Sequence, residues 1–206
     1  MNLIKQSYEI ISISDNILEN IERIARVCYK SENKITKYSS RKLIKQLITS
    51  KHFAMIEFGN ITVKFITDRG VTHELVRHRL CSFAQESTRF VNYQNKGIEF
   101  IYPVWWKSKT DKQKHIWSQA MEQSATHYNQ LINSGEPQGH ARSVLPNSLK
   151  TEIVVSANIR EWRHLLQLRT SRQAHSQMRG LMIPLLRELT KKLPSLFKDI
   201  TPFVKT

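Results

Sequence analysis

The sequence predicts an α+β fold in a single domain over residues 1–206, with a small antiparallel or mixed sheet flanked by helices. Segments 59–67 and 151–157 are rich in β-branched residues and predict strands. Apolar residues in most other segments recur at helical spacing. No internal repeat and no Gly/Ser/Pro-rich linker divides the chain, whose hydrophobic residues (40%) and charged residues (24%) are in globular proportion.

The N-terminal segments predict an edge strand followed by two helices. Residues 1–12 alternate weakly between apolar and polar side chains, as an edge strand does. Asp15 is the expected N-cap of the first helix, residues 30–39 are expected to form a loop, and Ser39 or Ser40 opens the second helix. The apolar positions expected to face inward are Ile17, Ile21, Ile24 and Val27 in the first helix, and Leu43, Ile44 and Leu47 in the second.

The middle of the chain combines a strand, a helix, a long loop and a long helix. The Asp-Arg-Gly sequence at 68–70 interrupts the strand at 59–67, and a helix is expected from there to about Arg79. Residues 81–98 are polar with interleaved aromatic residues and predict an ordered functional loop. A long helix is predicted over 111–133, where a Ser-Gly pair ends it.

The C-terminal segments alternate between helix and strand. A short helix is expected around Ala141, then a buried strand over 151–157 and two helices over 159–169 and 173–192. Pro184 lies inside the last of these and should end or kink it.

The charge of the chain indicates anionic ligands. Lys and Arg number 32 and Asp and Glu 17, which leaves a net charge of +15. The lysines scatter through polar segments, as on a solvated surface, whereas the arginines gather in two clusters. The first cluster contains Arg77, Arg79 and Arg89, and the second contains Arg160, Arg163, Arg169, Arg172 and Arg179. Guanidinium groups bind phosphate and carboxylate through paired hydrogen bonds. These clusters therefore indicate an anion-binding site more specifically than the net charge does.

The sequence predicts a cytoplasmic protein that does not associate with membranes. No apolar run approaches the roughly 18 residues of a membrane span, and the opening residues MNLIKQSYEI lack a signal-peptide pattern. Cys28 and Cys81 form neither a disulfide framework nor a metal set, and no His/Cys/Asp/Glu group has metal-ligand spacing. We therefore expect no metal site.

The segment with the most chemical information is 77–90, RHRLCSFAQESTRF. Successive helical residues point in different directions, so Arg77, His78 and Arg79 cannot share one helix face. Where a helix runs into a loop, such a triplet can surround an extended anion. Further donors follow at Ser82, Ser87, Thr88 and Arg89. The composition suits a phosphate joined to a polar ring, and it also suits a solvated helix end followed by a polar loop.

The spacing within this segment resembles the signature of the flavin-dependent thymidylate synthases. Arg-His-Arg is followed after two residues by Ser82, after four more by Ser87, and after one more by Arg89. Similarity to the family extends from about residue 25 to 190, through DRGVTHELVRHR, STRFVNY, HARSVLP and Asn158-Ile-Arg160. The resemblance implies an enzyme that methylates dUMP to dTMP, with methylenetetrahydrofolate as carbon donor and FAD, reduced by NADPH, as hydride carrier. It also implies a homotetramer whose sites are shared between subunits.

The resemblance further implies roles for individual residues. Those implied to hold FAD are Arg77, His78, Arg79, Gln85, Asn158, Ile159, Arg160, His164 and Glu57. Those implied to bind dUMP are Glu74, Arg77, Gln85, Glu86, Ser87, Thr88, Arg89, Arg142 and Arg169. The residues implied to take part in catalysis are Arg169 and His52, the histidine that approaches the flavin.

General chemistry is consistent with several of these roles. Asn158 and Arg160 lie where a strand ends and a helix begins, and helix N-termini favour anions. Arg160 and His164 are neighbours on one face of that helix. A guanidinium beside the uracil edge would stabilise the N3-deprotonated ring and make C5 more nucleophilic, which is the chemistry expected of Arg169. The alternative for Arg169 is a stabilising partner of the helix C-terminus.

Cys81 lies inside the signature, and we expect that it is not a nucleophile. The family motif requires no cysteine there, and hydride transfer from a flavin needs no covalent bond between enzyme and uracil. Leu80 beside it indicates a partly apolar setting, in which a small buried thiol is the common arrangement.

The chain also departs from the family pattern. Phe90 stands where the motif usually ends in tyrosine, Ala54 where a hydroxyl residue often meets FAD, and Gln173 where histidine is common, which leaves His175 without an assigned role. The remaining histidines match no family position and are expected to be surface or core residues: His115, His127 and His140.

Two other functions are compatible with the sequence. The first is a basic nucleic-acid-binding protein, in which Phe83, Phe90 and Tyr93 would serve as stacking platforms among the arginines. The second is a family member that binds nucleotide without turnover. The residues that argue against it are Arg77, Ser87, Arg89 and Arg169. We expect no specific nucleic-acid partner.

Overall fold

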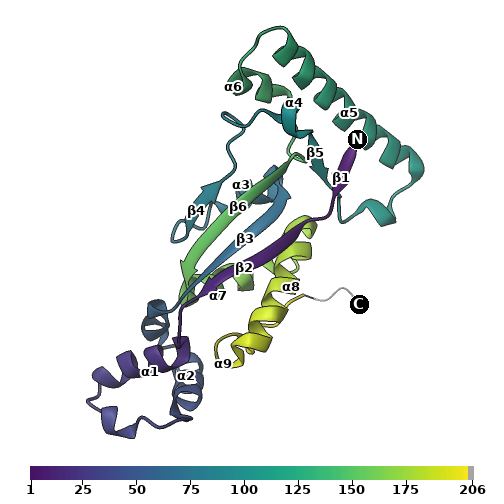
Figure 1. Cartoon of the computed structure of the whole chain (residues 1–206). Coiled ribbons are helices and arrows are strands. Elements are labelled where there is room, and N and C mark those ends of the chain that lie inside the picture. The colour runs from purple at the N-terminus through teal and green to yellow at the C-terminus, as the bar shows by residue number, and fades with distance from the viewer. Residues whose placement is uncertain (204–206) are drawn as a thin grey trace. The chain divides into compact units, whose positions relative to one another are not determined.

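The computed structural model describes residues 1–203 and confirms the α+β class (Figure 1). In chain order its strands and α-helices are β1 (Asn2–Ile4), β2 (Ser7–Ile13), α1 (Ile17–Val27), α2 (Ser39–Thr49), β3 (Asn60–Asp68), α3 (Arg69–Leu75), β4 (Ser82–Gln85), α4 (Tyr93–Lys96), β5 (Glu99–Ile101), α5 (Asp111–Asn133), α6 (Gln138–Ala141), β6 (Lys150–Asn158), α7 (Ile159–Arg169), α8 (Ser176–Lys192) and α9 (Pro194–Phe197). Short 3-10 helices lie at Glu32–Lys34, Phe53–Phe58, Trp106–Ser108 and Arg142–Val144.

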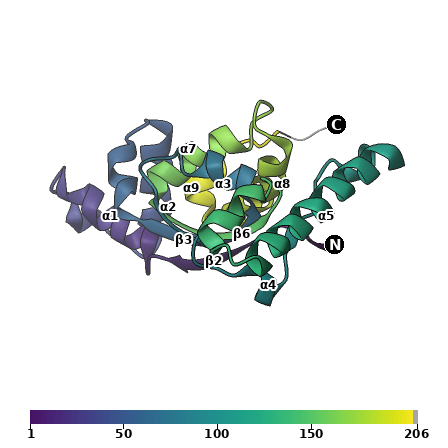
Figure 2. The ribbon, with the colours of Figure 1, turned by 90° about the horizontal axis from the view of Figure 1, so that it is seen from above.

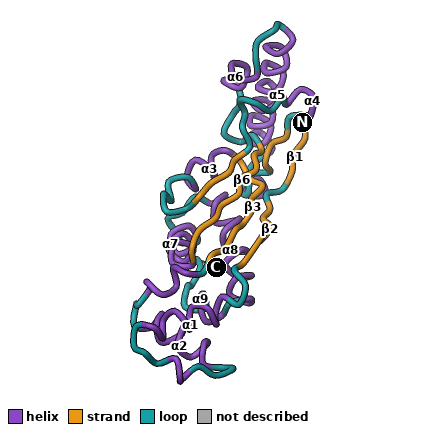
Figure 3. Tube along the Cα trace, turned by 60° about the vertical axis from the view of Figure 1, so that its left-hand side comes forward, coloured by secondary structure: helices purple, strands orange, loops and turns teal. Residues whose placement is uncertain are grey.

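Backbone pairing arranges the strands, drawn in orange in Figure 3, into a larger and a smaller sheet. The larger has the order β2-β3-β6-β4, and in the smaller β1 pairs in parallel with β5. β2 is an edge strand, as expected for the N-terminal segment. β3 and β6 alternate along their lengths between buried and half-buried side chains, which is the period-two pattern of strands and confirms both predictions.

The chain groups into two compact units, each built from separate segments. Unit 1 comprises Met1–Tyr8, Lys64–Arg77 and Phe83–Val154. Unit 2 comprises Glu9–Val63, His78–Ser82 and the residues from Val155 onward. Since β3 and β6 contribute residues to both units, the units are not successive domains along the sequence.

Unit 1 is organised around the long helix α5, drawn in green in Figure 2. The helix has a capping box: the Thr110 hydroxyl accepts the N–H of Gln113, and the Gln113 side chain accepts the N–H of Thr110. Its buried residue Tyr128 packs beside Tyr93, and the Tyr128 hydroxyl accepts the N–H of Tyr93 at 3.3 Å. These contacts hold α4, and with it the end of the 81–98 segment, against α5.

Unit 2 contains helices on which charged side chains are buried. α1 packs against α2, and α7 packs against α8. Trp162 of α7 is fully buried and donates its indole N–H to the carbonyl of Ile61 at 2.8 Å. Arg163, 4% exposed, donates two hydrogen bonds to the Asp199 carboxylate at 2.7 and 2.6 Å. These hydrogen bonds hold the pKa of Asp199 below its usual value, so the buried guanidinium is paired with a charged carboxylate at the surface.

The helix expected to reach Arg79 is shorter than predicted and ends at Leu75. It begins as expected, because the Asp68 carboxylate caps it by accepting the N–H of Val71 at 2.7 Å. Beyond Leu75 the backbone forms turns, one of which joins the N–H of Cys81 to the carbonyl of His78 at 2.9 Å. His78, which follows the first of these turns, is buried.

The 81–98 segment is also more ordered than a loop, since it contains β4 and α4, and β5 follows directly. β4 continues into a backbone hydrogen bond from the N–H of Glu86 to the carbonyl of Glu152, at 2.9 Å. Elements of three or four residues have no measurable periodicity, which is why the sequence predicts none of them.

Three smaller predictions about the helices are wrong. α1 is preceded by Asn16, which takes the left-handed conformation at φ 45°, rather than by Asp15 as N-cap. Val27, expected to face inward, is 54% exposed at the last position of α1. α8 begins at Ser176 rather than 173. Pro184 does not end this helix, which continues to Lys192 with buried leucines on both sides of the proline.

Candidate functional site

The most tightly organised polar group of unit 2 joins residues of α7 to His78, and we call Glu161, His78, His164 and Arg169 the arginine centre. The Arg169 Nε–H donates to His78 Nε2 at 2.9 Å. On the other side of the ring, His78 Nδ1 lies 3.4 Å from a carboxylate oxygen of Glu161. The His164 ring meets the His78 ring edge-on at 5.9 Å between centroids. The imidazole of His78 therefore bridges the first and last turns of α7.

The arginine centre holds His78 as a neutral imidazole. Burial, reinforced by the charge of Arg169 and by His164, lowers the pKa of His78 from 6.5 to about 4. Because Nε2 accepts a hydrogen bond from Arg169, the ring proton of neutral His78 belongs on Nδ1, facing Glu161. His78 and Glu161 are both 6% exposed, so little water competes for these contacts. The result is a guanidinium whose Nε–H is fixed by a neutral imidazole.

Among the residues implied to hold FAD, those of unit 2 are either part of the framework or exposed at the surface. Asn158 and Ile159 belong to the framework: the Asn158 side chain caps α7 by accepting the N–H of Glu161 at 2.9 Å, and Ile159 is fully buried. Arg160 and Arg79 instead have exposed side chains. The only carboxylate within the described residues that pairs with Arg160 is that of Glu57, at 2.6 Å, and Arg79 pairs with none.

A second polar group lies in unit 1, in the segment 85–89, which we call the polar loop. The Gln85 amide donates to the hydroxyls of Thr72 and Thr151 at 2.9 and 3.3 Å. The Glu86 carboxylate accepts the hydroxyl of Tyr93 at 2.9 Å and lies 3.4 Å from the Lys150 ammonium. The side chains that begin the loop are thus fixed by the strands and by α4.

The second half of the polar loop lies beside α6. The Arg142 guanidinium donates to the hydroxyl of Thr88 at 3.1 Å, and Thr88 is 5% exposed. The Arg89 side chain passes Gly139 of α6 at a distance where an added Cβ would make only ordinary contact, 3.5 Å. The Ser87 hydroxyl accepts the N–H of Arg89 at 3.3 Å. The structure thus brings together the loop and Arg142, which are separated by more than fifty positions in the sequence.

The remaining predicted residues lie at the edges of these groups. Arg77 follows α3 with its side chain exposed, and its N–H donates to the carbonyl of Glu74 at 3.3 Å. Glu74 itself is half-buried in the last turn of α3. His52 is exposed just before the 3-10 helix that carries Glu57.

Sequence reasoning missed Glu161 and the charged residues beneath the polar loop. Glu161 follows the N-cap Asn158 by three residues and precedes His164 by three, a helical spacing that places Glu161 in the first turn and His164 one turn further along the same face. Lys150 lies 2.7 Å from the Glu152 carboxylate, and Lys64 lies 2.5 Å from its second oxygen. The alternation of buried and half-buried positions along β3 and β6 could have located Lys64, Lys150 and Glu152, since all three occupy half-buried positions on these strands.

Cys81 is a buried, free cysteine of unit 2. Burial, together with Glu161, raises the pKa of the Cys81 thiol to about 12, and the side chain is 8% exposed. Within residues 1–203, no three His, Cys, Asp or Glu side chains are grouped so that they could hold a metal ion. No helix in the same part of the chain is long and apolar enough to cross a membrane.

Comparisons with known proteins agree on one family. Residues 9–195 match the family described as thymidylate synthase complementing protein. A flavin-dependent thymidylate synthase of Geobacter sulfurreducens is 31% identical over 186 residues, which cover 86% of this chain and 79% of that protein. The enzyme of the same name from Pyrococcus furiosus is 30% identical over 189 residues, covering 91% and 71%.

A solved structure is similar over nearly the whole chain. It is the crystal structure of a UMP/dUMP methylase, PolB, from Streptomyces cacaoi, bound with 5-Br dUMP. The TM-score is 0.82, the sequence identity is 25%, and the match covers 96% of each chain.

Proposed function

Since the chain belongs to the flavin-dependent thymidylate synthase family, we propose that it methylates dUMP to dTMP, with methylenetetrahydrofolate as carbon donor and FAD, reduced by NADPH, as hydride carrier. The relatives bear the name of this activity, and the similar structure is that of a dUMP methylase bound to a dUMP analogue. The protein's own residues bind and orient the reactants and stabilise charge.

The observation that carries the proposal is the fixed guanidinium of Arg169. His78, held neutral and backed by Glu161, accepts the Nε–H of Arg169 at 2.9 Å. A guanidinium already oriented before substrate arrives costs no reorganisation when negative charge develops on the uracil ring. Arg169 is therefore the proposed catalytic residue, which stabilises the ring deprotonated at N3 and makes C5 more nucleophilic. His78 and Glu161 are positioning residues.

The residues of unit 2 fit a flavin dinucleotide. The guanidinium groups of Arg79 and Arg160 are exposed, and guanidinium groups are suited to the pyrophosphate of FAD. His164 would add contacts, and the turn at His78 would supply backbone groups. When bound, the flavin supplies the hydride chemistry that amino-acid side chains lack.

The polar loop and Arg142 would bind the nucleotide. Arg142 and Arg89 would pair with the phosphate, while Gln85, Glu86 and Ser87 offer acceptors and donors for the sugar and the ring. The hydrogen bond between Arg142 and Thr88 supports this role, because it holds the guanidinium beside the loop before ligand binds.

We propose that no cysteine attacks the uracil. A cysteine nucleophile reacts as the thiolate, and a pKa near 12 keeps the Cys81 sulfur protonated at neutral pH. Cys28 is exposed and lies 3.9 Å from the sulfur of Met55, with no general base at hydrogen-bond distance among the described residues.

The active unit is proposed to be a homotetramer with sites shared between subunits. Mixing an inactive Arg169→Ala variant with an inactive Arg79→Ala variant tests this arrangement, if the two residues serve one site from different chains. Recovered turnover in the mixed sample would support sharing. A monomer by light scattering that has full turnover would contradict it.

The function is tested by the visible spectrum of the purified protein and by chromatography of the nucleotide product. We expect flavin absorbance that co-purifies or appears on addition of FAD, and dTMP formed from dUMP, methylenetetrahydrofolate and NADPH. Arg79→Ala should lose flavin retention while its circular dichroism is unchanged. A folded protein without flavin binding at saturating FAD would refute the proposal.

A further inference from the structure

A groove of about 640 Å³ lies in unit 2 between α2 and α9, which pack against each other. Its volume is within the range of small-molecule sites. Four of the residues that line it are cations: Arg41, Lys42, Lys45 and Lys198. No residue of the groove has a role in the proposed function, so the groove is a second, unassigned feature of the unit.

The groove is separate from the residues implied to hold FAD, because it lies on another face of α2. The α2 residues that share a pocket with Arg160 and His52 are Leu43, Gln46, Leu47 and Ser50. The α2 residues that line the groove are Arg41, Lys42, Lys45, Ile48 and Thr49. The two sets have no member in common, and the turn of the helix places them on nearly opposite faces.

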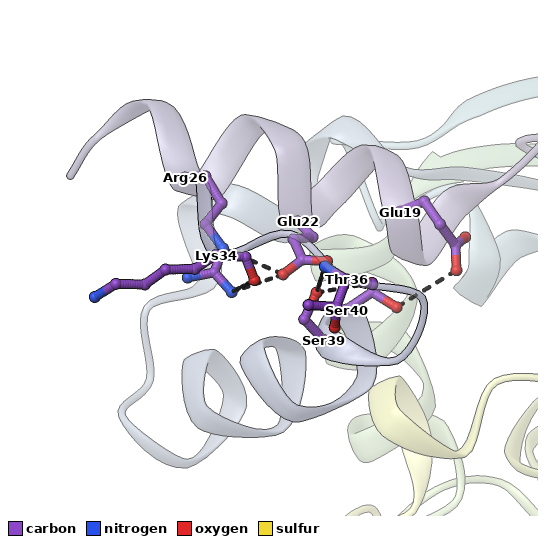
Figure 4. A network of polar contacts seen from close by, with 7 residues as sticks. All are labelled: Glu19, Glu22, Arg26, Lys34, Thr36, Ser39 and Ser40. Atoms are coloured by element: carbon purple, nitrogen blue, oxygen red, sulfur yellow. Dashed lines mark hydrogen bonds and ion pairs between the residues drawn. The ribbon is translucent and has the colours of Figure 1, made fainter. Parts of the chain in front are cut away.

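A network on the α1 side of α2 fixes the first turn of this helix and engages the nearby acids (Figure 4). Glu22 is 2% exposed and accepts two hydrogen bonds from the Arg26 guanidinium, at 3.2 and 2.8 Å. The Ser39 hydroxyl lies 2.8 Å from the other oxygen of Glu22, and the Ser40 hydroxyl donates to Glu19 at 3.4 Å. These carboxylates are therefore held by α1 and by the serines that open α2, away from the groove.

Asp199 is the only acidic residue among the described residues that line the groove, and it is already paired. The buried Arg163 donates to both oxygens of its carboxylate, at 2.7 and 2.6 Å. Arg163 also donates to the carbonyl of Leu196 in α9. The guanidinium thus anchors α9 and balances the charge of Asp199, so this carboxylate does not neutralise the lysines of the groove.

The four cations of the groove have no acidic partner. Within residues 1–203, no carboxylate lies at ion-pair distance from Arg41, Lys42, Lys45 or Lys198, and all four side chains are exposed. Arg41 and Lys45 are four positions apart on α2, and Lys198 follows the end of α9, so positive charge faces the groove from both walls. Cations gathered in this way repel one another, and an anion in the groove would remove that repulsion.

We propose that this groove binds a chain of phosphate groups, either the triphosphate of a nucleotide or inorganic tripolyphosphate. Phosphate oxygens accept charge-assisted hydrogen bonds from ammonium and guanidinium groups, and a triphosphate places several negative charges on one short chain. The half-buried Ile48 and the exposed Pro194 supply an apolar part of the wall, against which a sugar or base would pack. The site gives a role to lysine charge that the proposed function leaves without one.

A single-stranded nucleic acid shares the phosphate chemistry but fits the groove less well. Proteins that bind single strands stack the bases on aromatic side chains along an extended basic surface. None of the described residues that line the groove is aromatic, and its cations come from positions 41–45 of α2 and from the end of α9. The compact arrangement favours a small polyanion.

The test measures the binding of phosphate, pyrophosphate, tripolyphosphate and ATP by calorimetry at about 0.15 M salt. FAD and dUMP are present in excess, so that the flavin and nucleotide sites of the proposed function are occupied. The test variant is Lys45→Gln with Lys198→Gln, one lysine from each wall. The matched control is Lys107→Gln with Lys112→Gln, which removes the same charge from exposed lysines of unit 1.

We expect the wild-type protein to bind tripolyphosphate about tenfold more tightly than phosphate, with an affinity that falls as salt is raised. The test variant should bind tripolyphosphate about tenfold more weakly than the wild type, because two exposed ion pairs are lost. The control should stay within twofold of the wild type. Tighter binding of ATP than of tripolyphosphate would identify a nucleotide as the source of the phosphate chain, and equal binding would identify inorganic polyphosphate; both results support the inference.

Three results would overturn the inference. Equal affinity for phosphate and tripolyphosphate would show that the groove does not recognise a chain. An equal loss of binding in the test variant and the control would show a general effect of net charge. Tighter binding of a single-stranded oligothymidylate than of tripolyphosphate, lost in the test variant, would assign the groove to nucleic acid.

A conservative variant separates charge from structure. Lys45→Arg with Lys198→Arg keeps both charges and should retain the affinity for tripolyphosphate, and a loss as large as that of the glutamine variant would also overturn the inference. The inference goes beyond the proposed function and does not depend on it, because binding is measured directly. The rate of dTMP formation should be unchanged in the test variant, since neither lysine belongs to the proposed active site.

Discussion

The arginine centre of unit 2 and the polar loop of unit 1 hold arginines in opposite ways. In the arginine centre, Arg169 is fixed by a neutral histidine that is 6% exposed and that a buried glutamate backs. Beside the polar loop, the exposed Arg142 is held by the Thr88 hydroxyl, and Arg89 at the end of the loop is exposed. Arg169 is half-buried. A partly desolvated, oriented cation acts more strongly on developing charge, whereas an exposed one contributes mainly to binding.

Removing Arg169 should therefore have the largest effect. Arg169→Ala is expected to lower the rate of dTMP formation by roughly 10²–10³-fold, as loss of one preorganised donor does, and to leave FAD bound. The rate is measured by chromatography of dTMP and the flavin by its visible spectrum. Arg172→Ala is the control, because Arg172 is an exposed arginine just beyond α7. If the rate of the Arg169→Ala variant stayed within tenfold of the wild-type rate, Arg169 would not be the residue that stabilises the charge on the uracil ring.

The buried histidine of the arginine centre should also make stability depend on pH. Its pKa falls from 6.5 to about 4 on folding, so the unfolded chain binds more protons between these values. The stabilisation is complete above about pH 6.5 and is lost as the pH falls towards 4, by at most about 3 kcal/mol.

Urea unfolding of the wild type and of His78→Gln from pH 7.5 to 4 measures this dependence. The variant should have the flatter profile in that window, while Glu161, His164 and Arg169 continue to face the site in both proteins. Parallel profiles would show that His78 does not change its protonation on folding.

Substitutions in the polar loop should weaken the binding of dUMP more than they lower the rate of the chemical step. Thr88→Val removes the hydroxyl that accepts from Arg142 and should raise the KM for dUMP about tenfold, since hydrogen bonds to charged groups contribute about 1.5–3 kcal/mol. The kcat should change little. Thr88→Ser keeps the hydroxyl and should remain close to wild type. A fall in kcat at unchanged KM would place the loop in the chemical step and remove the contrast with the arginine centre.

The smallest effect is expected at the thiols. Cys81→Ala should keep dTMP formation within a few-fold of wild type, because a thiol with a pKa near 12 is not a nucleophile at neutral pH. Cys28→Ala should behave alike. Loss of turnover in a folded, flavin-loaded Cys81→Ala protein, or uracil trapped on Cys81 by mass spectrometry, would overturn the mechanism proposed for the arginine centre.

The sequence by itself determined the longer elements and the family. Strands β3 and β6 and helices α5 and α7 follow from apolar periodicity, which is a property of neighbouring residues and is therefore visible along the chain. The spacing of the arginine signature pointed to the family that the comparisons then established. The short elements β4, α4 and β5 were missed because three or four residues carry too little pattern.

The contacts and the burial of the charged residues depend on the tertiary structure and could not be predicted from the sequence. His78 and Arg169 are 91 positions apart, and nothing local predicts that the imidazole would bridge Arg169 to Glu161. The sequence predicted no role for Glu161, because its role depends on burial beside His78, which comes from another segment of the chain. The groove between α2 and α9 likewise depends on how these two helices pack together. Long-range packing sets the burial of a charge, and burial sets its pKa and its strength.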